Sequence, residues 1–172
     1  LGDDVWLAHC VHLDDPAVKR LAGSGTSVAH CPTSNARLGA GLARVADLRA
    51  LDVAVGLGVD GSASNDNSNL MEGVRHALMV NRLTYDAASV THLDAFRWAS
   101  EGSARCLGRN DIGVIAVGRE ADLAFYTLDG IVAGPTEGFR TITWSLFSLT
   151  TSRGGALALF LAGVPIALAF AL

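Results

Sequence analysis

The 172-residue sequence has few charged residues, few cysteines and no excess of positive charge. Charged residues make up 17% of the chain and the formal net charge is −4, so a nucleic-acid partner is not expected. Cys10, Cys31 and Cys106 form no C-x-x-C pair, and no secretory signal pattern is visible at the N-terminus. We therefore expect reduced thiols and a cytoplasmic location.

Apolar residues, in contrast, are abundant. Half of the residues are hydrophobic and the mean hydropathy is +0.34, which is more apolar than an ordinary soluble domain. The length suits one domain. The sequence does not begin with Met and opens almost directly on a β-prone run, so we expect it to be a piece of a longer protein.

Short β-prone runs alternate with helical segments in the first 60 residues. The runs are Val5–Ala8, Thr26–Ala29 and Val55–Val59, and the predicted helices are Pro16–Ala22 and Leu42–Leu51. This alternation predicts an α/β fold with a parallel sheet covered by helices. Apolar periodicity predicts further helices over residues 69–83 and 92–107, and a strand follows at Leu123–Tyr126.

The sequence changes character after Asp129. The only charges that follow are Glu137, Arg140 and Arg153, and residues 155–172 are 18 uncharged, mostly apolar residues. This length is the lower limit for a membrane-spanning helix, and Pro165 would kink such a helix. Three interpretations stay open: a membrane segment, a buried core helix, or an out-of-frame tail.

Three of the β-prone runs end in a residue that can bind a metal ion or move a proton. These residues are His9, His30 and Asp60. In a (β/α)₈ barrel the active site forms at the carboxyl ends of the strands, so residues in these positions are predicted to be catalytic. Carboxylate and imidazole both bind Zn²⁺ or Fe²⁺, which activates water for hydrolysis. By contrast, His76 and His92 fall on predicted helices and are expected to be structural.

Several sequence blocks resemble the amidohydrolase superfamily, and within it the mononuclear-metal aminohydrolases that deaminate purine- or triazine-type rings. These blocks are Ala8-His9-Cys10-Val11-His12-Leu13, Ala29-His30-Cys31-Pro32-Thr33-Ser34-Asn35, residues 56–65, residues 103–109 and residues 118–124. The resemblance implies the C-terminal portion, about strands six to eight, of a (β/α)₈ metal-dependent hydrolase barrel, with the start of a small β-sandwich segment. The expected parts are a partial barrel at residues 1–111, a return segment at 112–129 and a divergent apolar tail at 130–172.

The resemblance also implies roles for individual residues. Asp60 would ligate the metal, Zn²⁺ or alternatively Fe²⁺, and shuttle a proton, while His9 would contact the substrate and the metal-bound hydroxide. Ser62, Ser64 and Asn65 would line the pocket for a small heterocyclic substrate; a polar turn with a helix cap is an equally good interpretation of them.

His30 and His12 are assigned a weaker, supporting role around the metal ligands. No sequence feature indicates an oligomeric state.

Other expected motifs of this family do not occur in the sequence. There is no His-x-His pair, and no His-x-x-Glu, so three of the four expected metal ligands and the proton-delivering glutamate are missing. We therefore expect this chain by itself not to catalyse deamination. The alternative is a catalytically inactive remnant, associated with a membrane through residues 155–172. A zinc deaminase of the cytidine type is disfavoured, because its H-x-E and P-C-x-x-C signature is missing.

Overall fold

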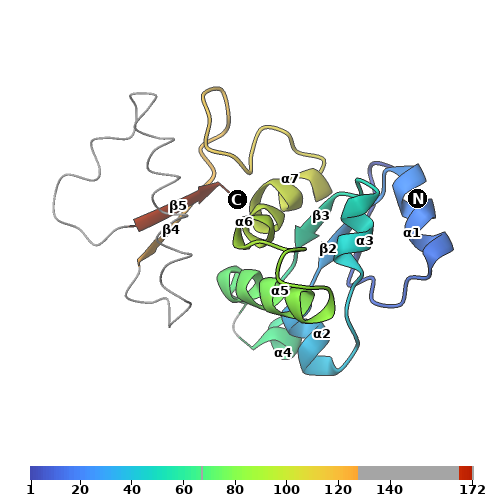
Figure 1. Ribbon diagram of the computed structural model, residues 1–172. Coiled ribbons are helices and arrows are strands. Elements are labelled where there is room, and N and C mark those ends of the chain that lie inside the picture. Colours follow the sequence, from blue (N-terminus) through green and yellow to red (C-terminus); the bar gives the residue numbers. More distant parts are fainter. Residues whose placement is uncertain (67, 128–166, 172) are drawn as a thin grey trace. The chain divides into compact units, whose positions relative to one another are not determined.

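The computed structural model describes residues 1–66, 68–127 and 167–171 (Figure 1). The chain divides into two compact units, with the main division after Asp122. The first unit carries every residue for which a catalytic or supporting role is predicted. In the second, strands β4 (Leu123–Thr127) and β5 (Ala167–Ala171) pair into a two-stranded sheet. Strand β4 agrees with the strand predicted at Leu123–Tyr126.

The first unit is built on a parallel sheet of three strands in the order β1-β2-β3. The strands are β1 (Trp6–Ala8), β2 (Ser27–His30) and β3 (Val55–Leu57). Leu7 is paired with Val28, and His30 with Leu57. Helix α1 (Asp15–Ser24) connects β1 to β2, and helices α2 (Pro32–Leu38) and α3 (Val45–Ala50) connect β2 to β3. The predicted alternation of strands and helices around a parallel sheet is confirmed.

Helix boundaries follow the local chemistry. Helix α1 begins at an N-cap, Asp14, whose side chain accepts a hydrogen bond from the Ala17 N–H at 2.8 Å, and it ends at Gly25 with φ = 75°. Helix α5 (Leu70–Thr84) matches the predicted helix at 69–83 and is capped by Asn69. Helix α2 and the short helix α4 (Ser62–Asn65) were not predicted as helices, because neither segment has an apolar periodicity.

The helix predicted over residues 92–107 is interrupted by a wider turn. Helix α6 (His92–Arg97) leads into a π-helix, η1 (Trp98–Gly102), and then into α7 (Ser103–Cys106). The Ser103 Oγ lies 3.2 Å from both the N and the O of Leu57, so this segment hydrogen-bonds to strand β3. A Cβ added at Gly102 would collide with the backbone carbonyl oxygen of Val55. Glycine is therefore required where η1 meets β3.

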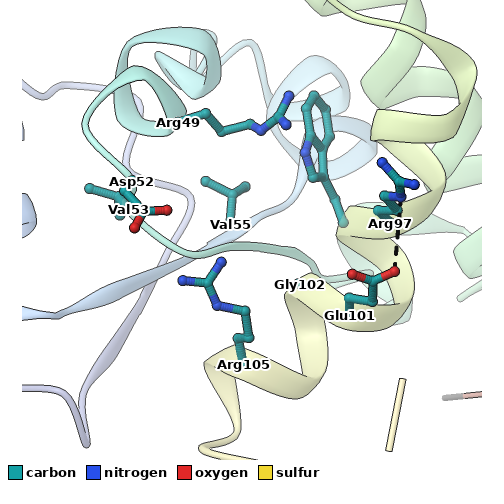
Figure 2. A pocket seen from close by; sticks show the side chains of 9 residues that line it. Arg49, Asp52, Val53, Val55, Arg97, Glu101, Gly102 and Arg105 are labelled. Atoms are coloured by element: carbon teal, nitrogen blue, oxygen red, sulfur yellow. Dashed lines mark ion pairs between the residues drawn. The ribbon is translucent and has the colours of Figure 1, made fainter. Parts of the chain in front are cut away.

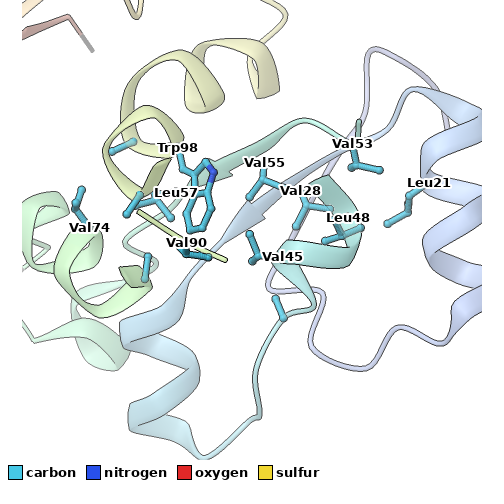
Figure 3. Close-up of a cluster of buried hydrophobic side chains, with 14 of the residues drawn as sticks. Leu21, Val28, Val45, Leu48, Val53, Val55, Leu57, Val74, Val90 and Trp98 are labelled. Atoms are coloured by element: carbon cyan, nitrogen blue, oxygen red, sulfur yellow. The ribbon is translucent and has the colours of Figure 1, made fainter. Parts of the chain in front are cut away.

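The core lies between the sheet and the helices that pack against it (Figure 3). Val28, Val55 and Leu57 contribute from the strands, and Leu48 and Trp98 contribute from α3 and η1. All five side chains are buried. Burial of this apolar surface is the main favourable term in the free energy of folding, and it fixes the carboxyl ends of the strands relative to one another.

The part of the apolar tail that the structure describes is a strand and not a helix. Ala167–Ala171 form strand β5, whereas a helix was one of the expectations for this segment. The remainder of the predicted segment, residues 155–166 and 172, lies outside the described residues. None of the helices in the described ranges is long and apolar enough to cross a membrane. The boundaries predicted at residues 111 and 129, and the out-of-frame interpretation, stay predictions.

Candidate active site

His9 and Asp60 meet at the carboxyl edge of the sheet. His9 directly follows β1, and Asp60 lies three residues after β3. The Nε2 of His9 is 3.7 Å from the Oδ2 of Asp60, and the two side chains are 37% and 33% exposed. They follow the two outer strands of the sheet, β1 and β3, whose carboxyl ends lie at the same edge with β2 between them, and their side chains meet across the end of β2. This pair is accessible to a small molecule from solvent.

The backbone at both positions adopts a conformation that L-residues rarely take. The φ angles of His9 and Asp60 are 66° and 62°. Positive φ is uncommon outside glycine and tends to occur at functional sites, where the surrounding structure offsets its cost. The same strain at the ends of two strands supports a functional interpretation of the pair over a simple turn.

Three hydrogen bonds keep the Asp60 carboxylate ionised. Its Oδ2 accepts from the Ser34 Oγ at 2.6 Å and from the Ser64 Oγ at 2.9 Å, and its Oδ1 accepts from the Gly61 N–H at 2.8 Å. These bonds lower the pKa of Asp60 to about 2. The bond from Ser34 has the largest effect on this pKa, followed by those from Gly61 and Ser64. The side chain is therefore an anion across the physiological pH range.

Replacing Ser34 with alanine is expected to raise the pKa of Asp60, because it removes the largest stabilisation of the charged form. The Ser64→Ala control removes a weaker bond and should raise this pKa less. A carbon-detected NMR titration of the Asp60 carboxyl in the metal-free chain measures both shifts. Equal shifts in the two variants, or none, would contradict the assigned order of the hydrogen bonds.

Asn35 orients the imidazole of His9. The Nδ1 of His9 lies 2.8 Å from the Oδ1 of Asn35. An amide oxygen only accepts, so Nδ1 carries the hydrogen and the unprotonated Nε2 of the neutral ring faces Asp60. This tautomer is assigned from the hydrogen bond. When His9 is neutral, its Nε2 is a hydrogen-bond acceptor on the open side of the site. When His9 is protonated, its Nε2 is a donor.

Ser34 and Asn35 are functional candidates to which the sequence assigned no role. They are adjacent residues on helix α2, both essentially inaccessible to solvent, and one contacts each member of the His9–Asp60 pair. Helix α2 begins directly after β2, so its first turn lies beside the ends of both neighbouring strands. Two consecutive polar residues following a buried strand were the only signal that could have identified them.

The three predicted substrate-binding residues in the loop after β3 differ in exposure and in contacts. Ser62 is exposed at the start of α4, and Ser64 contacts Asp60. Asn65 is buried; its amide nitrogen donates to the Val59 carbonyl and its oxygen accepts from the Ser68 N–H at 3.0 Å. Both ends of the Asn65 amide are therefore occupied within the loop. The substrate-binding roles of all three stay predictions.

The other histidines lie away from the pair. His12 is exposed, and no hydrogen bond or ion pair joins it to His9 or Asp60 within the described ranges. The His76 Nδ1 lies 2.9 Å from the Thr33 Oγ, which links α5 to α2, and His92 begins α6. The His76 contact agrees with a structural role for that residue. The Nε2 of His92 is buried without a hydrogen-bond partner in the described part of the chain, so a structural role for His92 stays a prediction.

His30 is buried beneath the site. Its Nε2 lies 3.5 Å from the Asn81 Nδ2, while its Nδ1 has no hydrogen-bond partner in the described part of the chain. Burial, and secondarily the charge of His9, lower the pKa of His30 to about 4. His30, the last residue of β2, is therefore neutral at physiological pH, and its supporting role around the metal ligands stays a prediction.

The buried imidazole predicts a loss of stability in mild acid. The pKa of His30 in the folded state lies below its ordinary value of 6.5, so the unfolded state binds the extra proton first. The free energy of unfolding should fall by up to about 3 kcal/mol between pH 6.5 and about 4. Urea unfolding at a series of pH values measures this slope. The His30→Gln variant should lose the His30 part of the slope; an unchanged slope would contradict the assignment.

The described residues do not complete a metal site. No group of three or more His, Cys, Asp or Glu side chains within them is arranged to hold a metal ion. A catalytic zinc ion takes three protein ligands, and the site offers one carboxylate and one imidazole.

Comparison with known proteins identifies the family. The model of the amidohydrolase family matches residues 1–150, so this chain belongs to the amidohydrolase family, and the predicted resemblance is confirmed. The match extends past residue 129, where the resemblance was expected to end. The three parallel strands with their helices accordingly form part of an α/β hydrolase barrel.

Three similar proteins are named as a deaminase, an aminohydrolase and a chlorohydrolase. The 8-oxoguanine deaminase of Pseudomonas aeruginosa is 49% identical over 129 residues, which are 75% of this chain and 29% of that protein. The hydroxydechloroatrazine ethylaminohydrolase of Pseudomonas sp. strain ADP is 43% identical over 134 residues, covering 75% of this chain and 27% of the relative. A solved atrazine chlorohydrolase from Arthrobacter aurescens, in complex with zinc, is 37% identical with a TM-score of 0.68, covering 70% of this chain and 27% of that one. The chain spans less than a third of the length of each.

Proposed function

We propose that this chain is the part of a metal-dependent aminohydrolase that contains barrel strands six to eight, as β1, β2 and β3. The complete enzyme would hydrolyse a non-peptide C–N bond on a purine- or triazine-type ring. The observation that carries the proposal is the contact between His9 and the ionised Asp60 at the carboxyl edge of the sheet. The relatives that deaminate 8-oxoguanine or act on hydroxydechloroatrazine support the substrate class.

The residues of the site have separable tasks in this proposal. Asp60 supplies one carboxylate ligand to a zinc ion, a metal whose role in such enzymes is to acidify bound water; the remaining ligands belong to other parts of the complete enzyme. Asp60 also takes a proton from the attacking water. Asp60 then passes this proton to the leaving amine. His9, when protonated, donates a hydrogen bond through Nε2 to the developing oxygen on the ring.

The cellular setting follows from the same proposal. All three cysteines are free thiols, as expected for a cytoplasmic enzyme acting on a small heterocycle. The alternative of an inactive, membrane-associated remnant is supported by no observation on the described residues.

A chimeric enzyme tests the proposal. The 129 aligned residues of this chain replace the matching segment of the Pseudomonas aeruginosa 8-oxoguanine deaminase. We expect the chimera to release ammonia from 8-oxoguanine, guanine or a triazine, and the 172-residue chain alone to release none. Metal content and a thermal melt establish that the chimera is folded and loaded. A folded, zinc-loaded chimera that is inactive on all of these rings would overturn the proposal.

A further inference from the structure

A second concave site lies at the opposite end of strand β3 from Asp60. A pocket of about 200 Å³ is lined by Val55, the first residue of β3, by Val53 just before this strand, and by residues of α3, α6, η1 and α7. Its wall is buried and apolar, whereas its rim is charged (Figure 2). The charged lining residues are Arg49, Asp52, Arg97, Glu101 and Arg105. None of these residues takes part in the site around Asp60.

The buried wall contains a hydrogen-bond donor that no protein group satisfies. Trp98 is only 4% exposed, and its Nε1 has no partner among the described residues. Figure 3 shows this nitrogen on the side of the indole that faces Val55, which is another lining residue. A buried N–H without an acceptor is costly, and it indicates that an acceptor is supplied from outside the fold.

The rim provides positive charge that is only partly neutralised. Arg105 forms no ion pair within the described ranges, and its guanidinium lies across the pocket from that of Arg49 in Figure 2. Arg97 is 3.9 Å from Glu101, a long contact between two exposed side chains. Arg49 is held in place by Asp94 at 3.2 Å and by the face of Trp98, 5.4 Å from the ring centroid. In Figure 2 the guanidinium groups of Arg49 and Arg105 face one space, whereas that of Arg97 lies apart from them beside Glu101.

The backbone around the pocket is itself unusual. Trp98, Glu101 and Gly102 all belong to the π-helix η1. The π-helix is rare and occurs frequently at functional sites, because the extra residue in the turn displaces side chains from their usual positions. Here the wide turn places one indole, one carboxylate and one glycine against the same cavity.

We propose that this pocket binds a phosphate group. Guanidinium groups bind phosphate oxygens through paired, charge-assisted hydrogen bonds, and the Trp98 N–H supplies a further donor from the wall. The carboxylates of Asp52 and Glu101 oppose any anion. The three arginines of the lining exceed these carboxylates by one charge, and phosphate, with a charge of about −1.5 to −2 at neutral pH, presents more acceptor oxygens to the guanidinium groups than a single carboxylate does. The group is either inorganic phosphate or the phosphate of a small phosphorylated molecule.

Titration of the ¹⁵N-labelled 172-residue chain with inorganic phosphate tests the proposal. The indole N–H resonance of Trp98, assigned by its loss in Trp98→Phe, should shift saturably. Arg105→Ala should weaken phosphate binding about tenfold. Trp98→Phe, followed through backbone amide resonances because its indole N–H is absent, should weaken binding less, because that variant keeps an aromatic ring. Arg20→Ala removes an equal charge from an exposed position on α1 and should leave binding unchanged.

Two further arms decide the source and the specificity of the ligand. A nucleoside monophosphate that binds at least tenfold more tightly than inorganic phosphate identifies a phosphorylated small molecule, whereas equal affinities identify free phosphate. Acetate and chloride at matched ionic strength should give no saturable shift. A shift that is equal for acetate and phosphate, that persists in Arg105→Ala, or that never saturates would overturn the proposal. Each of these outcomes leaves the proposed aminohydrolase function untouched.

Discussion

Replacing Asp60 with asparagine is expected to lower the rate of ring deamination by the chimeric enzyme about 10³-fold, within the range that proton-transfer groups supply. Asparagine has the shape of aspartate and tolerates the positive φ of this position. The substitution therefore removes the charge and the proton-accepting oxygen while it keeps the backbone. Ammonia release at saturating substrate measures the loss, and bound zinc measured alongside it should fall, because one ligand is weakened.

The matched control is Asp66→Asn. Asp66 lies on the same loop, also has a positive φ, and is paired with Arg37 at the surface. Its replacement should change the rate less than about twofold, since surface ion pairs contribute little. If Asp60→Asn kept more than a tenth of the activity, or if both variants lost the same fraction, Asp60 would not be the reacting carboxylate.

Replacing Gly102 with alanine is expected to cost about 3 kcal/mol of the free energy of unfolding, at the upper end of the range for overpacked sites. The new Cβ would meet the Val55 carbonyl oxygen, and neither this group nor the η1 backbone can rotate away as a flexible side chain would. The sheet and the π-helix must separate to accommodate it. Urea denaturation of the 172-residue chain, followed by tryptophan fluorescence, measures the difference.

Gly23→Ala provides the opposite outcome from the same chemical change. Gly23 lies inside α1, and a Cβ added there would have no atom within 4 Å. Alanine is the better helix former by about 0.5–1 kcal/mol, so this variant should be more stable than the parent chain. A Gly102→Ala variant within about 0.5 kcal/mol of the parent would show that η1 does not pack against β3 as described.

The strands and the paired residues at their ends were predictable because they depend on local pattern and on topology. Apolar runs that stop at His9 and Asp60 mark strands with polar ends, although only β3 is fully buried and β1 is largely exposed. Parallel pairing then places those ends at one edge, while the 3.7 Å contact also requires the two side chains to meet across the end of β2. Helix α5 was equally predictable, because its apolar spacing and its Asn69 cap are both local signals.

Other features depend on packing that a single sequence does not display. Helix α2 is short and polar, and its Ser34 and Asn35 are buried only because the ends of β1 and β3 lie beside them. The π-helix η1 arises where Gly102 and Ser103 meet β3, a contact that leaves the apolar periodicity of residues 92–107 unchanged. Strand β5 consists of apolar residues throughout, so its periodicity could not separate strand from helix.

The anchoring of both reacting groups to adjacent residues of α2 has a consequence for how new specificities arise. Ser34 and Asn35 are buried and hold Asp60 and His9, and Gly61 and Ser64 of the loop after β3 also donate to Asp60, whereas the exposed side chain of Ser62 takes part in none of these hydrogen bonds. Under the proposed function, a substitution at Ser62 would alter the entrance to the site and leave His9 and Asp60 aligned. Ser62 is therefore the first position to randomise in a directed-evolution library for a different heterocycle.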